Sequence, residues 1–385
     1  MRTDKRFPPT GAATALACLV ILGAAAVGQA ADEAVPGVAQ DDPVLLATEK
    51  EPLATKSLML DVTSAASRAI AVGERGHILV SESRQDWRQV EGVPTRATLT
   101  AVTAIGDDAW AVGHDGIILH SGDGGLTWQR QRLSLRAPDS DPDDPRIGAP
   151  LLDTLFLDAK HGFAVGAYSM LLETTDGGAT WTERTVTAHG GAPAADDAAA
   201  ADDGTAAGDE GATEGEEKWT FDESELELEE ESDPHLNGIA RTGDGSLFIV
   251  AERGSAFRST DGGQAWQRIQ LPYDGSMFGV IGYEGRHVLA FGLRGNVFES
   301  TDLGDNWKKI DTGVDLSIMG GTGWEGGGAA LVGANGVVLT RSATSASMLK
   351  HSHPDGAVLA SALSLAPGGQ LVVAGESGIG TYTPN

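Results

Sequence analysis

The chain has 385 residues, with 27 basic and 55 acidic side chains that give a formal net charge of −28 at pH 7. A balance this acidic argues against nucleic acid and anionic membrane surfaces as general partners, because both repel negative charge. The 52 glycines follow no collagen-like period, so they indicate many tight turns rather than a fibrous chain.

Residues 1–30 have the pattern of a secretory signal peptide. Basic residues open the chain, an apolar run extends from about Ala12 to Val27, and Gly28 and Ala30 supply small residues for cleavage after Ala30. The run is shorter than the roughly 20 residues that a membrane-spanning helix needs. We therefore expect cleavage and a periplasmic location for the mature protein.

The one cysteine, Cys18, lies inside this apolar run. A lipoprotein signal would place leucine three residues earlier, where this chain has Ala15, so we expect no lipid attachment. The mature chain then has no thiol, which excludes thiolate chemistry and a cysteine-ligated metal. Residues 31–43 are rich in Ala, Asp, Pro and Gly, and predict a flexible lead.

After the lead, the motif Val-Gly-x-x-Gly recurs seven times with variation. Successive first positions lie 40, 53, 85, 41, 41 and 42 residues apart, so the base period is about 41, with insertions after the second and third units. The paired positions are Gly73/Gly76, Gly113/Gly116, Gly166/Ser169, Ala251/Gly254, Gly292/Gly295, Gly333/Gly336 and Gly375/Gly378. Because such a period with short strands is typical of propeller blades, we predict an all-β fold, a seven-bladed β-propeller over residues 44–385.

Four strands are expected in each unit. In the second unit they are Leu99–Ile105, Ala109–Gly113, Ile117–His120 and a strand that begins at Trp128. The seventh unit starts with Val358–Leu363 and stops at Thr383, after its third strand. A missing fourth strand leaves unpaired backbone groups at the blade edge. We therefore expect either Val44–Thr48 or Leu53–Leu60 to close the ring as an N-terminal strand.

Four units carry an Asp-box, Ser/Thr-x-Asp-x-Gly-x-x-Trp, between the third and fourth strands. Its aspartates and tryptophans are Asp123 and Trp128, Asp176 and Trp181, Asp261 and Trp266, and Asp302 and Trp307. In such a turn the aspartate accepts backbone N–H groups, glycine permits positive φ, and the tryptophan packs against the neighbouring unit. We interpret the boxes as structural. The sixth unit has Arg341-Ser342-Ala343-Thr344 in place of a box.

The second insertion, residues 188–233, has a different composition. From Asp196 to Asp233 it contains 17 acidic residues against the single Lys218. Such a segment cannot bury enough apolar surface to order itself, so we predict an acidic disordered insertion within the propeller. An acidic peptide that docks on a basic partner or binds Ca²⁺ is the alternative that stays open.

Strand order places the turns between second and third strands, here called the mouth turns, at one end of the ring with both insertions. The Asp-boxes fall at the other end. Arg75, Arg253 and Arg294 recur immediately before the second glycine, and a planar guanidinium suits a carboxylate or a carbonyl on a partner. We predict that these arginines bind a partner, together with His114, Asp115, Tyr168 and Asn335. The alternative is that the mouth-turn residues serve only solubility.

This arginine occurs in three units, in motifs such as V-G-E-R-G and F-G-L-R-G. The units are Ala71–Val90, Phe248–Ile269 and Leu289–Ile310, and in the last two the motif is followed by an Asp-box. They resemble the photosystem II assembly/stability factor family of seven-bladed propellers, over about residues 44–385 apart from the insertions. The resemblance implies a non-enzymatic assembly chaperone that binds a membrane protein through an arginine patch. In non-photosynthetic bacteria it suggests an exporter of the resistance-nodulation-division type as partner. The strongly negative charge departs from the family pattern.

The competing class is a secreted Asp-box glycoside hydrolase. A sialidase-like site needs an arginine triad and a tyrosine nucleophile, and the chain has only four tyrosines, Tyr168, Tyr273, Tyr283 and Tyr382. A carboxylate pair such as Asp115 and Glu252 across the channel mouth stays open. His351 and His353 lack a third ligand at useful spacing, so we expect no metal and no small-molecule cofactor.

Overall fold

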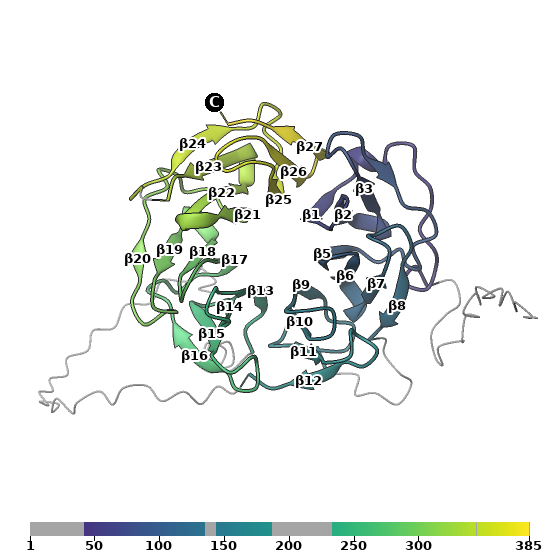
Figure 1. Ribbon diagram of the computed structural model, residues 1–385, viewed down its shortest axis with the longest axis horizontal. Helices are drawn as coiled ribbons and strands as arrows, with labels where there is room; N and C mark the ends of the chain where they lie inside the picture. Colours follow the sequence, from purple (N-terminus) through teal and green to yellow (C-terminus); the bar gives the residue numbers. More distant parts are fainter. Residues whose placement is uncertain (1–41, 135–143, 187–232, 344, 385) are drawn as a thin grey trace, which may run out of the picture. The chain divides into compact units, whose positions relative to one another are not determined.

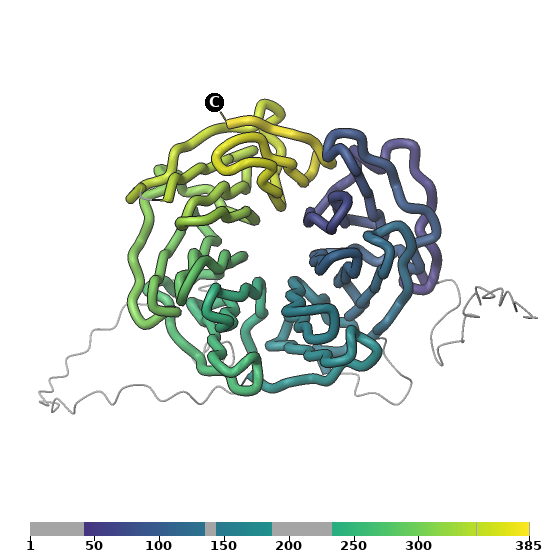
Figure 2. Tube along the Cα trace, in the orientation of Figure 1, coloured from purple at the N-terminus to yellow at the C-terminus, as the bar shows by residue number. Residues whose placement is uncertain are grey.

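A computed structural model describes residues 42–134, 144–186, 233–343 and 345–384. The predicted signal peptide, nearly all of the lead and nearly all of the acidic insertion lie outside these ranges, so the boundaries of these segments stay predictions. The described residues form a seven-bladed β-propeller, as the sequence predicts (Figure 1). Each blade is an antiparallel sheet whose strands run outward in chain order, and the first and seventh blades meet to complete the ring (Figure 2).

The innermost strands are β1 (Met59–Ser64), β5 (Leu99–Ile105), β9 (Leu151–Phe156), β13 (Leu236–Arg241), β17 (Met277–Gly282), β21 (Ile318–Trp324) and β25 (Leu359–Ser364). The second strands are β2 (Ala69–Gly73), β6 (Asp108–Gly113), β10 (Gly162–Gly166), β14 (Leu247–Ala251), β18 (Val288–Gly292), β22 (Gly328–Gly333) and β26 (Leu371–Gly375). Both sets surround the central axis, with the first set nearest to it (Figure 1).

The third strands are β3 (Ile78–Ser81), β7 (Ile118–Ser121), β11 (Leu171–Thr174), β15 (Ser255–Ser259), β19 (Val297–Ser300), β23 (Val337–Arg341) and β27 (Gly378–Tyr382). The fourth strands are β4 (Arg88–Gln89), β8 (Gln129–Arg132), β12 (Thr182–Arg184), β16 (Gln267–Gln270), β20 (Lys308–Lys309) and β24 (Leu349–Ser352). Short 3₁₀ turns are η1 (Ala54–Lys56), η2 (Glu74–Gly76), η3 (His114–Gly116), η4 (Leu293–Gly295), η5 (Glu325–Gly327) and η6 (Ala334–Gly336).

Burial explains the residue pattern of the strands. Apart from Asp108, every residue of the second strands is buried, and these strands are continuous apolar runs because blades cover both of their faces. Fourth strands such as β12 and β20 are fully exposed and polar. The first glycine of the repeat motif has a steric cause, since a Cβ on Gly113 would lie 2.1 Å from the Thr98 carbonyl oxygen.

The four Asp-boxes join blades two to five to the blade that precedes each of them. The Asp123 carboxylate accepts the Leu126 and Thr127 N–H groups at 3.0 and 2.9 Å. Trp128 of the second blade is buried in an apolar cluster that combines residues of the first and second blades. Trp266 of the fourth blade likewise lies edge-to-face against Phe163 of the third, with 6.2 Å between ring centroids. Box tryptophans therefore cover the preceding sheet.

The predicted closure by an N-terminal strand is not confirmed. The seventh blade has three strands, and within the described residues no segment before β1 pairs with β27. Val44–Thr48 packs on the first blade instead, where the Thr48 N–H donates to the Val93 carbonyl at 2.8 Å. Of the other candidate, Leu53–Leu60, the last two residues belong to β1 and η1 contacts β27. An apolar cluster that combines Met59 and Val62 with residues of β26 joins the two blades.

Candidate functional site

The mouth turns share an unusual backbone conformation. In six of the seven blades, the residue two positions after the end of the second strand is in the left-handed region, with φ between 53° and 57°. These residues are Arg75, Asp115, Tyr168, Arg253, Arg294 and Asn335. They make up six of the nine non-glycine residues with positive φ in the described ranges. Because this conformation costs an L-residue about 1–2 kcal/mol, its recurrence marks a position where the turn geometry holds a projecting side chain.

The three predicted arginines are exposed at this position, each in a different blade. The Arg75 guanidinium lies 3.6 Å from the Glu51 carboxylate and is 62% exposed. The Arg253 carbonyl accepts a hydrogen bond from the Gln270 side chain at 3.3 Å, which holds the turn. For Arg294, the described part of the chain provides no ion pair. The structure thus brings these side chains to one end of the ring, around its axis.

The other predicted binding residues occupy the same end. Tyr168 is 36% exposed and lies edge-to-face against His235, with 5.0 Å between centroids. Burial raises the pKa of the Asp115 carboxyl, and the neighbouring His114 opposes this shift. Asn335 is exposed in the sixth blade. The mouth turns of the first six blades therefore present cationic, aromatic, amide and carboxyl groups.

The channel below the mouth turns contains residues that the sequence did not single out. Every innermost strand has a register shift after its first residue. Residues at this irregularity line a cavity of about 220 Å³, among them Leu60, Thr100, Leu152, Asn237, Phe278, Met319 and Ala360. The exposed lining of this cavity is mainly polar, with Thr100, Asn237 and two aspartates beside apolar side chains, and the cavity lies within the ring of mouth turns.

Two aspartates lie in the wall of this cavity, each half-buried. Asp61 accepts hydrogen bonds from the Val102 N–H of the second blade at 2.9 Å and from the Ser361 hydroxyl of the seventh at 2.7 Å. Asp153 accepts the Ile239 N–H of the fourth blade at 2.8 Å. Each carboxylate therefore links innermost strands of different blades.

Burial raises the pKa of both channel carboxyls. The pKa of Asp153 rises to about 7, through desolvation first and the charge of Asp61 in smaller part. The pKa of Asp61 is also raised by burial, against the effect of its hydrogen bonds. Asp61 and Asp153 are each the third residue of an innermost strand. A charged residue at this place in an otherwise uncharged strand was the one signal in the sequence that could have indicated these channel carboxyls. The partners of Asp61 in other blades lie 41 and 300 residues away, and no local pattern predicts them.

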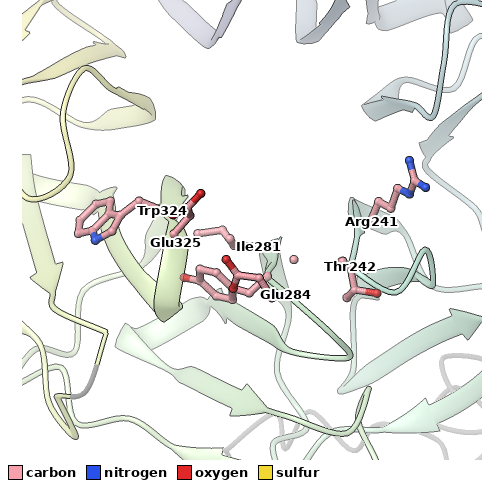
Figure 3. Close-up of a pocket in the computed structure, with 10 residues that line it drawn as sticks. Arg241, Thr242, Ile281, Glu284, Trp324 and Glu325 are labelled. Carbon is pink, nitrogen blue, oxygen red and sulfur yellow. The ribbon is translucent and has the colours of Figure 1, made fainter.

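A second recess lies at the opposite end of the ring, where the first-to-second strand turns of blades four to six meet. It has a volume of about 490 Å³ and is lined by Arg241, Tyr283, Glu284, Trp324 and Glu325, among others. Figure 3 shows Arg241 on one side and Trp324 with Glu325 on the other. No residue predicted to bind a partner lies in this recess.

Asp115 and Glu252, the carboxylate pair that the sequence left open, have separate surroundings. Glu252 accepts the His235 backbone N–H at 3.2 Å, so its contacts join it to the segment before β13 of its own blade rather than to Asp115. Among the described residues, no three His, Cys, Asp or Glu side chains are grouped to hold a metal ion. Within the same residues, no helix has the length and apolar character to cross a membrane.

The description "Photosynthesis system II assembly factor YCF48" belongs to a family model that matches residues 46–148 and 144–193. The chain resembles the Ycf48 family. The Ycf48 assembly protein of Thermosynechococcus vestitus (strain NIES-2133 / IAM M-273 / BP-1) is 40% identical over 126 residues, which are 31% of this chain and 35% of the relative. The Ycf48 assembly lipoprotein of Synechococcus sp. (strain CC9902) is 28% identical over 180 residues, 45% of this chain and 49% of the relative. The matches thus span half or less of these relatives' length.

Solved structures agree on the fold. A structure described as "YCF48 bound to D1 peptide" superposes with a TM-score of 0.57 at 14% identity, covering 90% of this chain and all of the Ycf48 chain. The WD40 propeller of Doa1 gives a TM-score of 0.55 at 10% identity, with 88% of this chain and 95% of the other covered. The Ycf48 relatives are named as assembly proteins, and none of these comparisons supports an exporter as partner.

Proposed function

We propose that this protein is a non-enzymatic assembly factor that binds a segment of a membrane protein through its mouth turns. The observation that carries the proposal is the repeated left-handed turn that projects Arg75, Arg253 and Arg294 at one end of the ring. Guanidinium groups that face solvent around the channel opening suit a peptide that offers carboxylates or carbonyl oxygens. The D1 peptide bound to Ycf48 in its solved structure supports a ligand of this kind.

The negative net charge of the chain restricts which partners can bind the mouth turns. The net charge of −28 repels most acidic partners at long range, so a partner must engage the local arginines directly. We infer that His114, Asp115, Tyr168 and Asn335 add hydrogen bonds and one aromatic contact around them. The predicted role of the acidic insertion stays a proposal, because residues 187–232 lie outside the described residues.

We place this binding outside the cytoplasm, in the periplasm. The predicted signal peptide supports the location, as does the word lipoprotein in the name of the Synechococcus relative. Cleavage after Ala30 and the absence of a lipid on Cys18 stay predictions. Mass spectrometry of the mature protein tests both, since a lipid on Cys18 would contradict them.

Replacing Arg75, Arg253 and Arg294 together with glutamate tests the binding surface. We expect crosslinking to membrane proteins in the native cell, followed by mass spectrometry, to lose its specific partner by at least tenfold, with an unchanged melting temperature. The matched control replaces Arg84, Arg241 and Arg286, which lie in or beside turns at the opposite end, with glutamate. Equal loss in the control, or retained crosslinking in the mouth variant, would contradict the proposal.

The glycoside hydrolase alternative makes a different prediction. The raised pKa of Asp115 is the observation in its favour, since a general acid needs a raised pKa. A panel of aryl glycosides should show no turnover. Turnover that disappears in both the Asp115→Asn and Glu252→Gln variants would favour the hydrolase and overturn the non-enzymatic assignment.

A further inference from the structure

The cavity at the mouth end of the channel, here called the channel cavity, carries charge on only part of its wall. Its volume is about 220 Å³, and Asp61 and Asp153 are the charged residues that line it. They belong to the first and third blades. At the same register the fifth and sixth blades have Gly279 and Gly320, which add no side chain. The wall therefore has an acidic side and an uncharged side.

The two carboxylates have neutral hydrogen-bond partners. Asp61 accepts backbone N–H groups and the Ser361 hydroxyl, and Asp153 accepts backbone N–H groups. Within the described part of the chain, no lysine, arginine or histidine forms an ion pair with either carboxylate. Burial raises the pKa of both carboxyls, and the charge of Asp61 adds to the shift of Asp153. A cation in the cavity would offset the loss of hydration and the repulsion between the two groups.

Apolar side chains line the same cavity. Leu60 and Leu152 directly precede the two aspartates, and Phe278 and Met319 occupy the equivalent places in the fifth and sixth blades. None of the four is fully buried, and Met319 is 39% exposed. A ligand that contacts both kinds of wall needs an apolar stem and a positively charged end. A lysine side chain has this form, because its stem packs on apolar surface while its ammonium group donates three hydrogen bonds.

The mouth turns lie directly above the channel cavity. In all seven blades, the first N–H of the mouth turn donates at 2.9–3.2 Å to the carbonyl of the residue just before the innermost strand, as from Glu74 to Leu58. Asp61 follows Leu58 by three residues, which is about 10 Å of strand at about 3.3 Å per residue. A long side chain of a segment that lies across the mouth turns can therefore reach into the cavity.

We propose that the partner segment places a lysine side chain in the channel cavity, with its stem against Phe278 and Met319 and its ammonium group beside Asp61 and Asp153. The inference rests on the proposed function, since it adds a second contact to the segment that the mouth-turn arginines bind. A metal ion is a poorer occupant, because a divalent cation needs more oxygen ligands than two carboxylates offer, and no third acidic or histidine side chain joins them among the described residues.

Butylammonium chloride, which reproduces the lysine side chain without its backbone, tests the cavity directly. In an NMR titration of the full chain at pH 8, the amide signals of Val102 and Ile239, which donate to the channel carboxylates, should shift saturably. The amide of Thr127, which donates to the box aspartate Asp123, should not shift. Neutral n-butanol should bind at least tenfold more weakly. Butylammonium should bind at least fivefold more weakly at pH 5, because Asp153, with a pKa of about 7, is then protonated.

Two variants separate recognition of the ammonium group from the structural role of the aspartates. Met319→Lys keeps both carboxylates and their hydrogen bonds and supplies a lysine from the wall itself, so butylammonium binding should fall at least tenfold with no fall in melting temperature at pH 8. Asp61→Asn combined with Asp153→Asn removes the charges and should give the same loss of binding. Ile105→Lys adds a lysine to an innermost strand outside the cavity wall, and this matched control should bind like the original.

Crosslinking in the native cell connects the cavity with the proposed function. The double asparagine variant and Met319→Lys should each capture the partner at least fivefold less well than the original, whereas Ile105→Lys should capture it fully. If the mouth arginine variant loses the partner while both cavity variants retain it, the proposed function stands and the lysine inference is wrong. No saturable shift at pH 8, or a shift of Thr127 as large as those of Val102 and Ile239, would also overturn the inference.

Discussion

The two ends of this propeller use repeated turns in opposite ways. At the Asp-box end, the aspartate side chain forms hydrogen bonds within its own turn. The Asp302 carboxylate accepts hydrogen bonds from the Ser300 hydroxyl at 2.7 Å, from the Asn306 backbone N–H at 2.9 Å and from the Asn306 side-chain amide at 2.8 Å. At the mouth end, the backbone adopts a costly conformation and Arg294 projects into solvent. The more conspicuous motif therefore builds the fold, and the plainer one is the surface that we propose for partner binding.

The pKa values of the carboxyl groups also differ between the Asp-boxes and the channel. Hydrogen bonds from the turn lower the pKa of Asp176 and Asp302 to about 2. In the channel near the mouth, burial raises the pKa of Asp153 to about 7. A box aspartate is thus stabilised as an anion, whereas a channel aspartate resists ionisation although it links two blades.

Removing a box tryptophan tests the structural end and should have the largest effect. Trp266→Ala removes a buried ring and its contact with Phe163, so we expect a loss of about 3–5 kcal/mol in the free energy of unfolding. Urea unfolding measures this difference. Arg253→Ala, at the other end of the same blade, should change the same quantity by less than about 0.5 kcal/mol. Similar losses in both variants would remove the distinction between the two ends.

The channel carboxyl should give the next largest effect. The pKa of Asp153 is higher in the folded chain than its ordinary value of 3.8, so unfolding releases protons between pH 4 and about 7. Its contribution to stability is therefore full below pH 4 and is lost as the pH rises to about 7. Asp61 is the other charged group that faces it.

Comparing Asp153→Asn with the original protein at pH 5 and pH 8 measures this contribution. The stability advantage of the original over the variant should shrink by on the order of 1–2 kcal/mol between these values. Asp302→Asn is the control, because its pKa of about 2 places its effect below pH 4. A constant difference for Asp153→Asn would show that the channel does not raise its pKa.

A mouth-turn substitution should give the smallest effect and the opposite sign. Asn tolerates the left-handed conformation better than Arg, and Asn335 already occupies it in the sixth blade. Arg294→Asn should therefore raise the free energy of unfolding by about 0.5 kcal/mol while weakening partner capture. If the variant lost stability instead, the arginine would be part of the turn structure rather than of the binding surface.

Much of the fold was predictable because the same short sequence pattern recurs in each blade and the strands of a blade are close in sequence. Each blade is a local meander, so strand boundaries such as those of β5 follow from alternation, glycine spacing and the box. The positions of the mouth turns followed from the same pattern. The left-handed backbone at Arg75 and Arg294 did not, because the residue type gives no sign of it.

The sequence alone determined the number of blades, the order of strands and the end of the ring at which each turn lies, because these depend on contacts within one repeat. Only the tertiary structure decided how the ring closes, since that joins residues such as Asp61 and Ser361 that are 300 positions apart. It also decided the surroundings of Asp153, whose carboxylate accepts the Ile239 N–H of the next blade, 86 positions away.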